Sequence, residues 1–70
     1  MEYFYSVIEV QNDGTPAVIP MCYTDENQAY AKYYTVLAAA AEASTAYHAC
    51  HIIRSDGTMI ESKVFDRRGE

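Results

Sequence analysis

Apolar and polar residues alternate over four short segments of the chain, and each pair of segments is joined by Asp-Gly-Thr. The first pair is 3–10 and 17–23, and the second pair is 47–54 and 58–65. Such alternation is typical of strands with one buried face. Asp-Gly between two strands favours a hairpin, because glycine adopts the left-handed conformation that closes the turn. The pattern therefore predicts two β-hairpins.

The segment between the hairpins, 25–44, changes to a helical period and contains neither glycine nor proline. Thr24 or Asp25 can cap this helix, and acidic residues in its first turn complement the helix dipole. The order of elements predicts an α+β fold, with a single ββαββ domain over 1–66 and a polar C-terminal tail over 67–70. Six residues recur at helical spacing and form the stripe that should pack on the sheet: Ala29, Tyr33, Val36, Leu37, Ala40 and Ser44.

Proline and charged residues indicate the order of the strands. Pro16 and Pro20 fall in the second strand, and proline cannot donate a hydrogen bond to a sheet ladder, so this strand is expected at an edge. Glu61 and Lys63 in the fourth strand suit the other edge. The predicted structure is a four-stranded antiparallel sheet of order 2-1-3-4, with the helix on one face.

Three-residue turns that end in glycine would set which residues face each other. They pair Ile8 with Val18, Ile52 with Ile60 and His51 with Glu61. One face then carries small and branched residues suited to lie beneath the helix: Phe4, Ser6, Ile8, Val18, Cys50, Ile52, Ile60 and Val64.

The other predicted face is larger and more aromatic. One helix covers only one face of such a sheet, so an apolar surface should remain uncovered whichever face the helix takes. The aromatic face is the predicted interface for self-association, and its members are Tyr3, Tyr5, Val7, Ile19, Met21, Tyr23, Tyr47, Ile53, Met59 and Phe65.

Composition narrows the class of partner. The 70 residues carry ten acids and five bases, a net charge of −5. Binding to phosphates needs converging lysines and arginines, so this balance argues against nucleic acid and anionic membranes. Seven tyrosines favour a protein interface, since tyrosine buries a large area with few rotatable bonds. The alternative is a single-stranded nucleic-acid-binding module that stacks bases on the tyrosine-rich face or uses Arg67 and Arg68.

The small size of the chain favours oligomerisation, because a core of this size is only marginally sufficient alone. We expect a homodimer that pairs face to face, with edge-to-edge pairing through the fourth strand as the alternative and a heterologous protein partner as a further option. The first residues lack the basic and apolar pattern of a signal peptide, and the longest apolar run is 36–41. A cytoplasmic protein with free thiols and no membrane span is expected.

Four residues resemble a metal or nucleophile set, namely Cys22, His48, Cys50 and His51. On a strand, His48 and Cys50 share a face while His51 points away, so at most three ligands could converge, with Cys22 expected on the His48 face. The spacing is not that of a zinc site. We therefore expect a buried thiol and half-exposed histidines, with no metal, no cofactor and no catalytic activity.

Short segments spread over most of the chain carry a family resemblance. They are 32–41 (KYYTVLAAAA), His48, Asp56-Gly57 and 65–68 (FDRR). These segments resemble small uncharacterised proteins of bacteriophages and prophages of gut Firmicutes. The resemblance implies a phage-derived accessory protein of a bacterial or phage-infected cell, and it brings no activity, cofactor or site residue with it.

Overall fold

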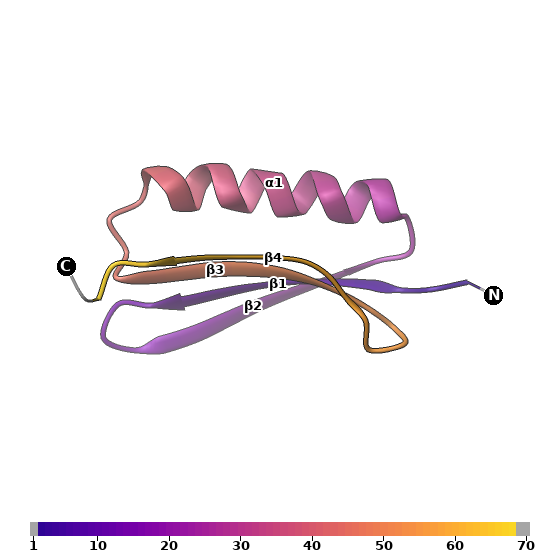
Figure 1. Ribbon diagram of the computed structural model, residues 1–70, viewed down its shortest axis with the longest axis horizontal. Helices are drawn as coiled ribbons and strands as arrows, with labels where there is room; N and C mark the ends of the chain where they lie inside the picture. Colours follow the sequence, from indigo (N-terminus) through magenta and orange to yellow (C-terminus); the bar gives the residue numbers. More distant parts are fainter. Residues whose placement is uncertain (1, 69–70) are drawn as a thin grey trace.

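The computed structural model describes residues 2–68, and it has one antiparallel sheet with a single helix across one face (Figure 1). The elements are β1 (Tyr5–Asn12), β2 (Pro16–Tyr23), α1 (Glu26–Glu42), β3 (Tyr47–Arg54) and β4 (Met59–Asp66). The strand order is β2-β1-β3-β4. The predicted α+β fold, its element order and its strand order are confirmed.

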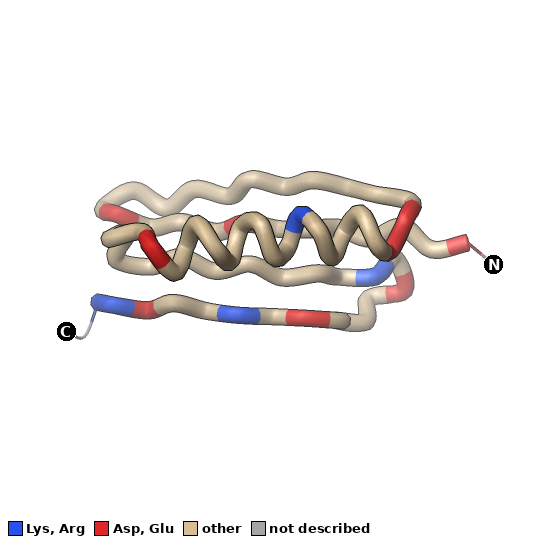
Figure 2. Tube along the Cα trace, turned by 90° about the horizontal axis from the view of Figure 1, so that it is seen from above, with Lys and Arg blue, Asp and Glu red and all other residues tan. Residues whose placement is uncertain are grey.

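The two edge strands differ in composition, as the sequence predicted. β2 contains Pro16 and Pro20 and no charged residue, whereas β4 carries Glu61 and Lys63 (Figure 2). The missing N–H groups of the two prolines suit an edge, where one side of the strand has no ladder partner.

The ends of α1 follow from local capping. The Asp25 side chain accepts a hydrogen bond from the backbone N–H of Asn27 at 2.9 Å, which satisfies a free donor of the first turn. Ser44 lies beyond the C-terminal end of α1 and is exposed, so its predicted place in the buried stripe is wrong. The rest of the stripe is confirmed: Leu37 is half-buried, and the buried members are Ala29, Tyr33, Val36 and Ala40.

A residue that follows β4 donates hydrogen bonds to the C-terminal end of α1 and to the loop after it. The Arg67 guanidinium donates to the carbonyls of Ala40 at 3.1 Å and Thr45 at 3.2 Å, and the Arg67 backbone N–H donates to Ala46 at 2.7 Å. These carbonyls include one left without a partner where a helix ends. Arg67 therefore belongs to the folded body, although it fell within the predicted tail. The tail positions 69 and 70 lie outside the described residues.

The register between β1 and β3 decides which face of the sheet α1 covers. Val7 opposes Ile52 and Glu9 opposes Cys50, so odd residues of β1 share a face with even residues of β3. Tyr5, Val7, Cys50 and Ile52 pack in one core with residues of α1. We call this face the helix side, and its strand residues are Tyr5, Val7, Glu9, Gln11, Ala17, Ile19, Met21, Tyr23, His48, Cys50, Ile52, Arg54, Glu61, Lys63 and Phe65.

This register contradicts the predicted faces, which joined even residues of β1 to even residues of β3. Ile8 and Ile52 were predicted to share a face, but they lie on opposite faces. No turn connects β1 to β3, so their register is set by packing. The observed register leaves Val7 and Ile52 only 1% exposed beneath α1.

The two hairpins also depart from the predicted pairs, in different ways. In the first, the loop is Asp13-Gly14-Thr15, so Ile8 opposes Pro20 and not Val18. The Asn12 side chain accepts from the Gly14 N–H at 3.2 Å, which places the turn one residue later than expected. The register between β1 and β2 therefore shifts by two residues. Because side chains alternate with a period of two, those of β2 keep their faces relative to β1.

The second hairpin begins as predicted and then changes register. The two expected turn hydrogen bonds form. The Arg54 backbone N–H donates to the Thr58 carbonyl, and the Gly57 backbone N–H donates to the Arg54 carbonyl, both at 2.8 Å. A bulge then leaves Ile60 as an extra residue, so Glu61 opposes Ile52 and Ser62 opposes His51. The predicted pairing of Ile52 with Ile60 and of His51 with Glu61 is therefore wrong. A shift of one residue reverses the faces of the rest of β4.

Candidate functional site

The face of the sheet that α1 does not cover is the most distinctive surface of the described chain. We call it the open face, and its central residues are Ser6, Ile8, Val10, Val18, Pro20, Cys22, Ala49, His51, Ile53, Ser62 and Val64. None of them is aspartate, glutamate, lysine or arginine. Within residues 2–68, charged residues reach this face only at one end, where Asp66 opposes Tyr47 and Arg68 lies over the Tyr47 ring.

The other charged residues of the strands, Glu9, Arg54, Glu61 and Lys63, lie on the helix side. The Glu9 carboxylate contacts His48 Nε2 at 2.6 Å, and the Lys63 ammonium lies 5.5 Å from the centre of the Phe65 ring. A sheet with one face in water normally alternates the other way, with apolar residues towards the helix and charged residues outward. The distribution of charge in this sheet is thus inverted.

The open face is accessible in the single chain. Val18 is 59% exposed and Val64 is 42% exposed, while Ile8, Val10 and Ile53 are half-buried by their neighbours. These side chains adjoin one another across four strands, so they form a continuous apolar surface. Contiguous exposed apolar surface of this kind marks interaction sites in soluble proteins.

The predicted aromatic interface is not one surface. Of its ten members, Tyr47, Ile53 and Met59 are placed on the open-face side of the sheet. The prediction that all ten share a face is wrong, because it depended on the incorrect β1–β3 register and missed the bulge. The other seven lie on the helix side, with Tyr5 and Val7 buried in the core: Tyr3, Tyr5, Val7, Ile19, Met21, Tyr23 and Phe65.

The four residues that resembled a metal or nucleophile set are divided between the two faces. His48 and Cys50 are buried on the helix side, whereas His51 and Cys22 are on the open face, so the expectation that Cys22 shares a face with His48 is wrong. Burial raises the pKa of the Cys50 thiol. Within residues 2–68, no group of three metal-ligating side chains gathers.

His48 belongs to a small polar cluster beneath α1. Its Nε2 atom bonds to the Glu9 carboxylate, and the Gln11 side chain donates to the same carboxylate oxygen at 2.9 Å. The side chains of His48 and Glu9 are only 5% and 15% exposed. These contacts hold the Glu9 and His48 side chains in a largely enclosed position beneath α1, with little access for a substrate.

His51 and Ser62 are paired on the open face, with 2.7 Å between His51 Nδ1 and Ser62 Oγ. That distance suits a nucleophile and its base. A working pair also needs a group that orients the histidine and donors for an oxyanion. In the described chain His51 makes no other side-chain hydrogen bond, and the flat strands around it are uncharged. The pair therefore supplies a polar contact within an apolar surface.

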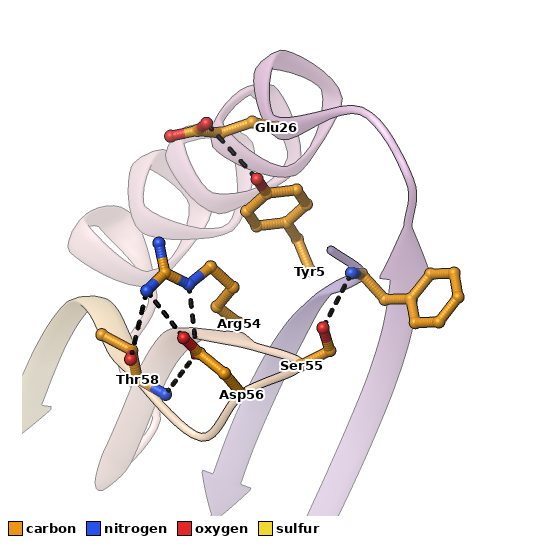
Figure 3. Close-up of polar contacts among 7 residues, drawn as sticks. Tyr5, Glu26, Arg54, Ser55, Asp56 and Thr58 are labelled. Atoms are coloured by element: carbon orange, nitrogen blue, oxygen red, sulfur yellow. Dashed lines mark hydrogen bonds and ion pairs between the residues drawn. The ribbon is translucent and has the colours of Figure 1, made fainter. Parts of the chain in front are cut away.

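A network of polar contacts lies at the other end of the sheet, around the β3–β4 turn (Figure 3). Arg54 donates to both carboxylate oxygens of Asp56, at 3.0 and 2.7 Å, and holds the pKa of that carboxyl well below its usual range. Phe4, just before β1, makes two hydrogen bonds with Ser55. The Phe4 N–H donates to the Ser55 hydroxyl, and the Ser55 N–H donates to the Phe4 carbonyl. The Tyr5 hydroxyl donates to Glu26, and burial followed by the nearby Glu26 charge raises the pKa of Tyr5. These contacts join the turn to β1 and to the start of α1.

A cavity opens beside this network, at the N-terminal end of α1. It is lined by Glu2, Tyr3, Tyr5, Thr24, Asp25 and Glu26. Its lining is acidic and aromatic, and it is separate from both histidine pairs.

The comparisons with known proteins leave the structure as the guide to function. No protein-family model, curated protein or solved structure matches the chain. Over residues 2–68, α1 is too short and too polar to cross a membrane.

Proposed function

We propose that the protein is a small non-enzymatic interaction protein that forms a homodimer through its open face. The observation that supports this most strongly is the inverted charge distribution: the uncovered face has no charged residue over its centre, while the face beneath α1 carries Glu9, Arg54, Glu61 and Lys63. When a second apolar surface removes such a face from water, the free energy of the system falls.

The dimensions of the open face suit a second copy of the same chain. Strands about 4.8 Å apart, with eight residues at about 3.3 Å each, give four strands an area of roughly 19 by 26 Å, or about 500 Å² for each copy. Two copies would bury about 1,000 Å² in flat projection, and side-chain relief brings this towards the 1,200–2,000 Å² of stable interfaces. The dimer would be a two-sheet sandwich with both helices on the outside and about 10 Å between the sheets.

Nucleic-acid binding receives less support from the same geometry. Of the residues that could stack on bases, Tyr5 and Tyr33 are buried beneath or within α1. The Arg67 guanidinium donates to a carbonyl at the end of α1, and the Arg68 guanidinium donates to the Asp66 carboxylate. The two arginines therefore do not form a free basic patch. A net charge of −5 opposes binding to a phosphate backbone.

The sequence resemblance to phage and prophage proteins is compatible with this function and is proposed with it. A short accessory protein that acts by assembly requires a surface and not a catalytic centre, and the open face would be that surface.

The test is sedimentation velocity over a dilution series of untagged protein, with two lysine variants. Ile8→Lys adds a charge to the centre of the open face, and Ala38→Lys adds the same charge to an exposed position on α1. Wild type and Ala38→Lys should sediment as dimers of the 7.9 kDa chain, and Ile8→Lys as a folded monomer. A wild type that stays monomeric at about 100 µM, or an Ile8→Lys variant that dimerises as wild type does, would reject the proposal.

A further inference from the structure

His51 occupies the middle of the open face. It is the fifth of eight residues in β3, an inner strand, and it opposes Ile8 on β1 and Ser62 on β4. Along its own strand its neighbours on this face are Ala49 and Ile53. In a dimer of two open faces, the imidazole would lie near the centre of the buried area.

The charged and titratable groups that face His51 can be followed strand by strand. β1 contributes none to the open face, and β2 contributes only Cys22, on the edge strand. β3 contributes Tyr47 at its end, and β4 contributes Asp66, also at its end and paired with Arg68. The bulge at Ile60 turns Glu61, the carboxylate expected opposite His51, to the helix side. The element packed on the other side, α1, is separated from His51 by the sheet.

We infer that protonation of His51 separates the dimer, so that assembly through the open face is controlled by pH; this inference depends on the proposed function. A neutral imidazole keeps its 2.7 Å contact with Ser62 and is compatible with an apolar interface. An imidazolium would be removed from water without a carboxylate nearby, and the second copy presents the same uncharged residues. Burying an unpaired charge is strongly unfavourable.

The direction and size of the effect follow from linkage. The dimer favours the neutral form, so it is stable at pH 8 and is lost as the pH falls through the range in which histidine takes up a proton. Each dimer contains two copies of His51, and dissociation can take up two protons. The dissociation constant should therefore rise by as much as about 100-fold for each pH unit below this range.

The experiment measures the dimer dissociation constant by sedimentation at pH 8, 7, 6 and 5, at constant ionic strength, for wild type and for His51→Gln. The wild-type constant should rise at least about 100-fold from pH 7 to pH 5, while circular dichroism shows an intact fold. Whatever its own affinity, His51→Gln should have nearly the same constant at every pH. This variant retains His48 and all carboxylates. It therefore distinguishes the contribution of His51 to the pH dependence from that of every other titrating group. His51→Asn is a second neutral substitution should the glutamine variant fail to fold.

Two outcomes would overturn the inference: a wild-type constant that changes less than about threefold between pH 8 and pH 5, or variants without His51 that keep the wild-type pH dependence. These outcomes differ from failure of the proposed function, in which no dimer forms even at pH 8.

Discussion

Both faces of the sheet contain apolar side chains, but their charged residues and their surroundings differ. On the helix side, three charged residues have partners: Glu9 contacts His48, Arg54 contacts Asp56, and Lys63 lies over the Phe65 ring. On the open face, Val18 and Val64 remain exposed, without a charged neighbour over the centre of the face. In this chain, therefore, the alternation of apolar and polar residues identifies two faces but does not say which face is in water.

Lysine substitutions at two adjacent positions of β1, one on each face, should have very different effects. Val7 is 1% exposed beneath α1, and Ile8 is half-buried on the open face. Val7→Lys should cost at least about 4 kcal/mol, enough to unfold a small domain. Ile8→Lys should remain folded but monomeric. Circular dichroism with thermal unfolding measures both effects, and a folded Val7→Lys together with an unfolded Ile8→Lys would mean that the faces are reversed.

A second adjacent pair tests the same contrast at the end of the sheet. Arg67 bonds carbonyls at the end of α1, whereas the exposed Arg68 pairs with Asp66 at the rim of the open face. Arg67→Ala should lower the free energy of unfolding by about 1–2 kcal/mol, because helix carbonyls lose a charged donor. Arg68→Ala should lower it by less than Arg67→Ala does, because the ion pair of Arg68 with Asp66 is exposed to water. Urea unfolding checks both, and equal losses from the two variants would contradict the separate roles given to them.

The rim of the open face should respond to acid. Arg68 and its backbone N–H lower the pKa of Asp66 to about 2, from 3.8. A lowered carboxyl pKa stabilises the fold above the unfolded-state pKa, and this contribution is lost as the pH falls from about 4 to 2. Asp66→Asn should therefore show a shallower fall in melting temperature over that range than wild type. Identical slopes would show that the ion pair does not contribute to stability in solution.

The smallest expected effect distinguishes the open face from the edge of the sheet. In a dimer formed through antiparallel β4 edges centred on Ser62, Lys63 of one copy would oppose Glu61 of the other. Lys63→Glu would then place like charges opposite each other and weaken the dimer. Pairing through the open face predicts no measurable change, since Lys63 lies on the helix side. Sedimentation of the variant at pH 8 decides between the two arrangements.

Local signals explain what could be predicted from the sequence. Asp-Gly turns, a helical segment without breakers and the prolines of β2 each act over a few residues, and they were enough for the α+β fold and the strand order. The existence of an uncovered apolar face also followed, because one helix cannot cover both faces.

The membership of that face depended on two features that local signals do not fix. The β1–β3 register joins strands that are far apart in sequence, so it follows from how tightly Val7 and Ile52 pack beneath α1. The bulge leaves a weak trace, since the adjacent apolar residues Met59 and Ile60 interrupt the alternation of β4. Recognising that interruption would have placed Glu61 on the helix side and Ser62 beside His51.

An isotope-filtered NOE experiment on a mixture of labelled and unlabelled protein at pH 8 detects only contacts between copies, so it identifies the dimer interface. We predict contacts among the side chains of Ile8, Val10, Ile53 and Val64, and none from the exposed surface of α1. A spectrum without contacts between copies, or with contacts confined to α1 or to the β4 edge, would contradict the assignment of the open face as the dimer interface.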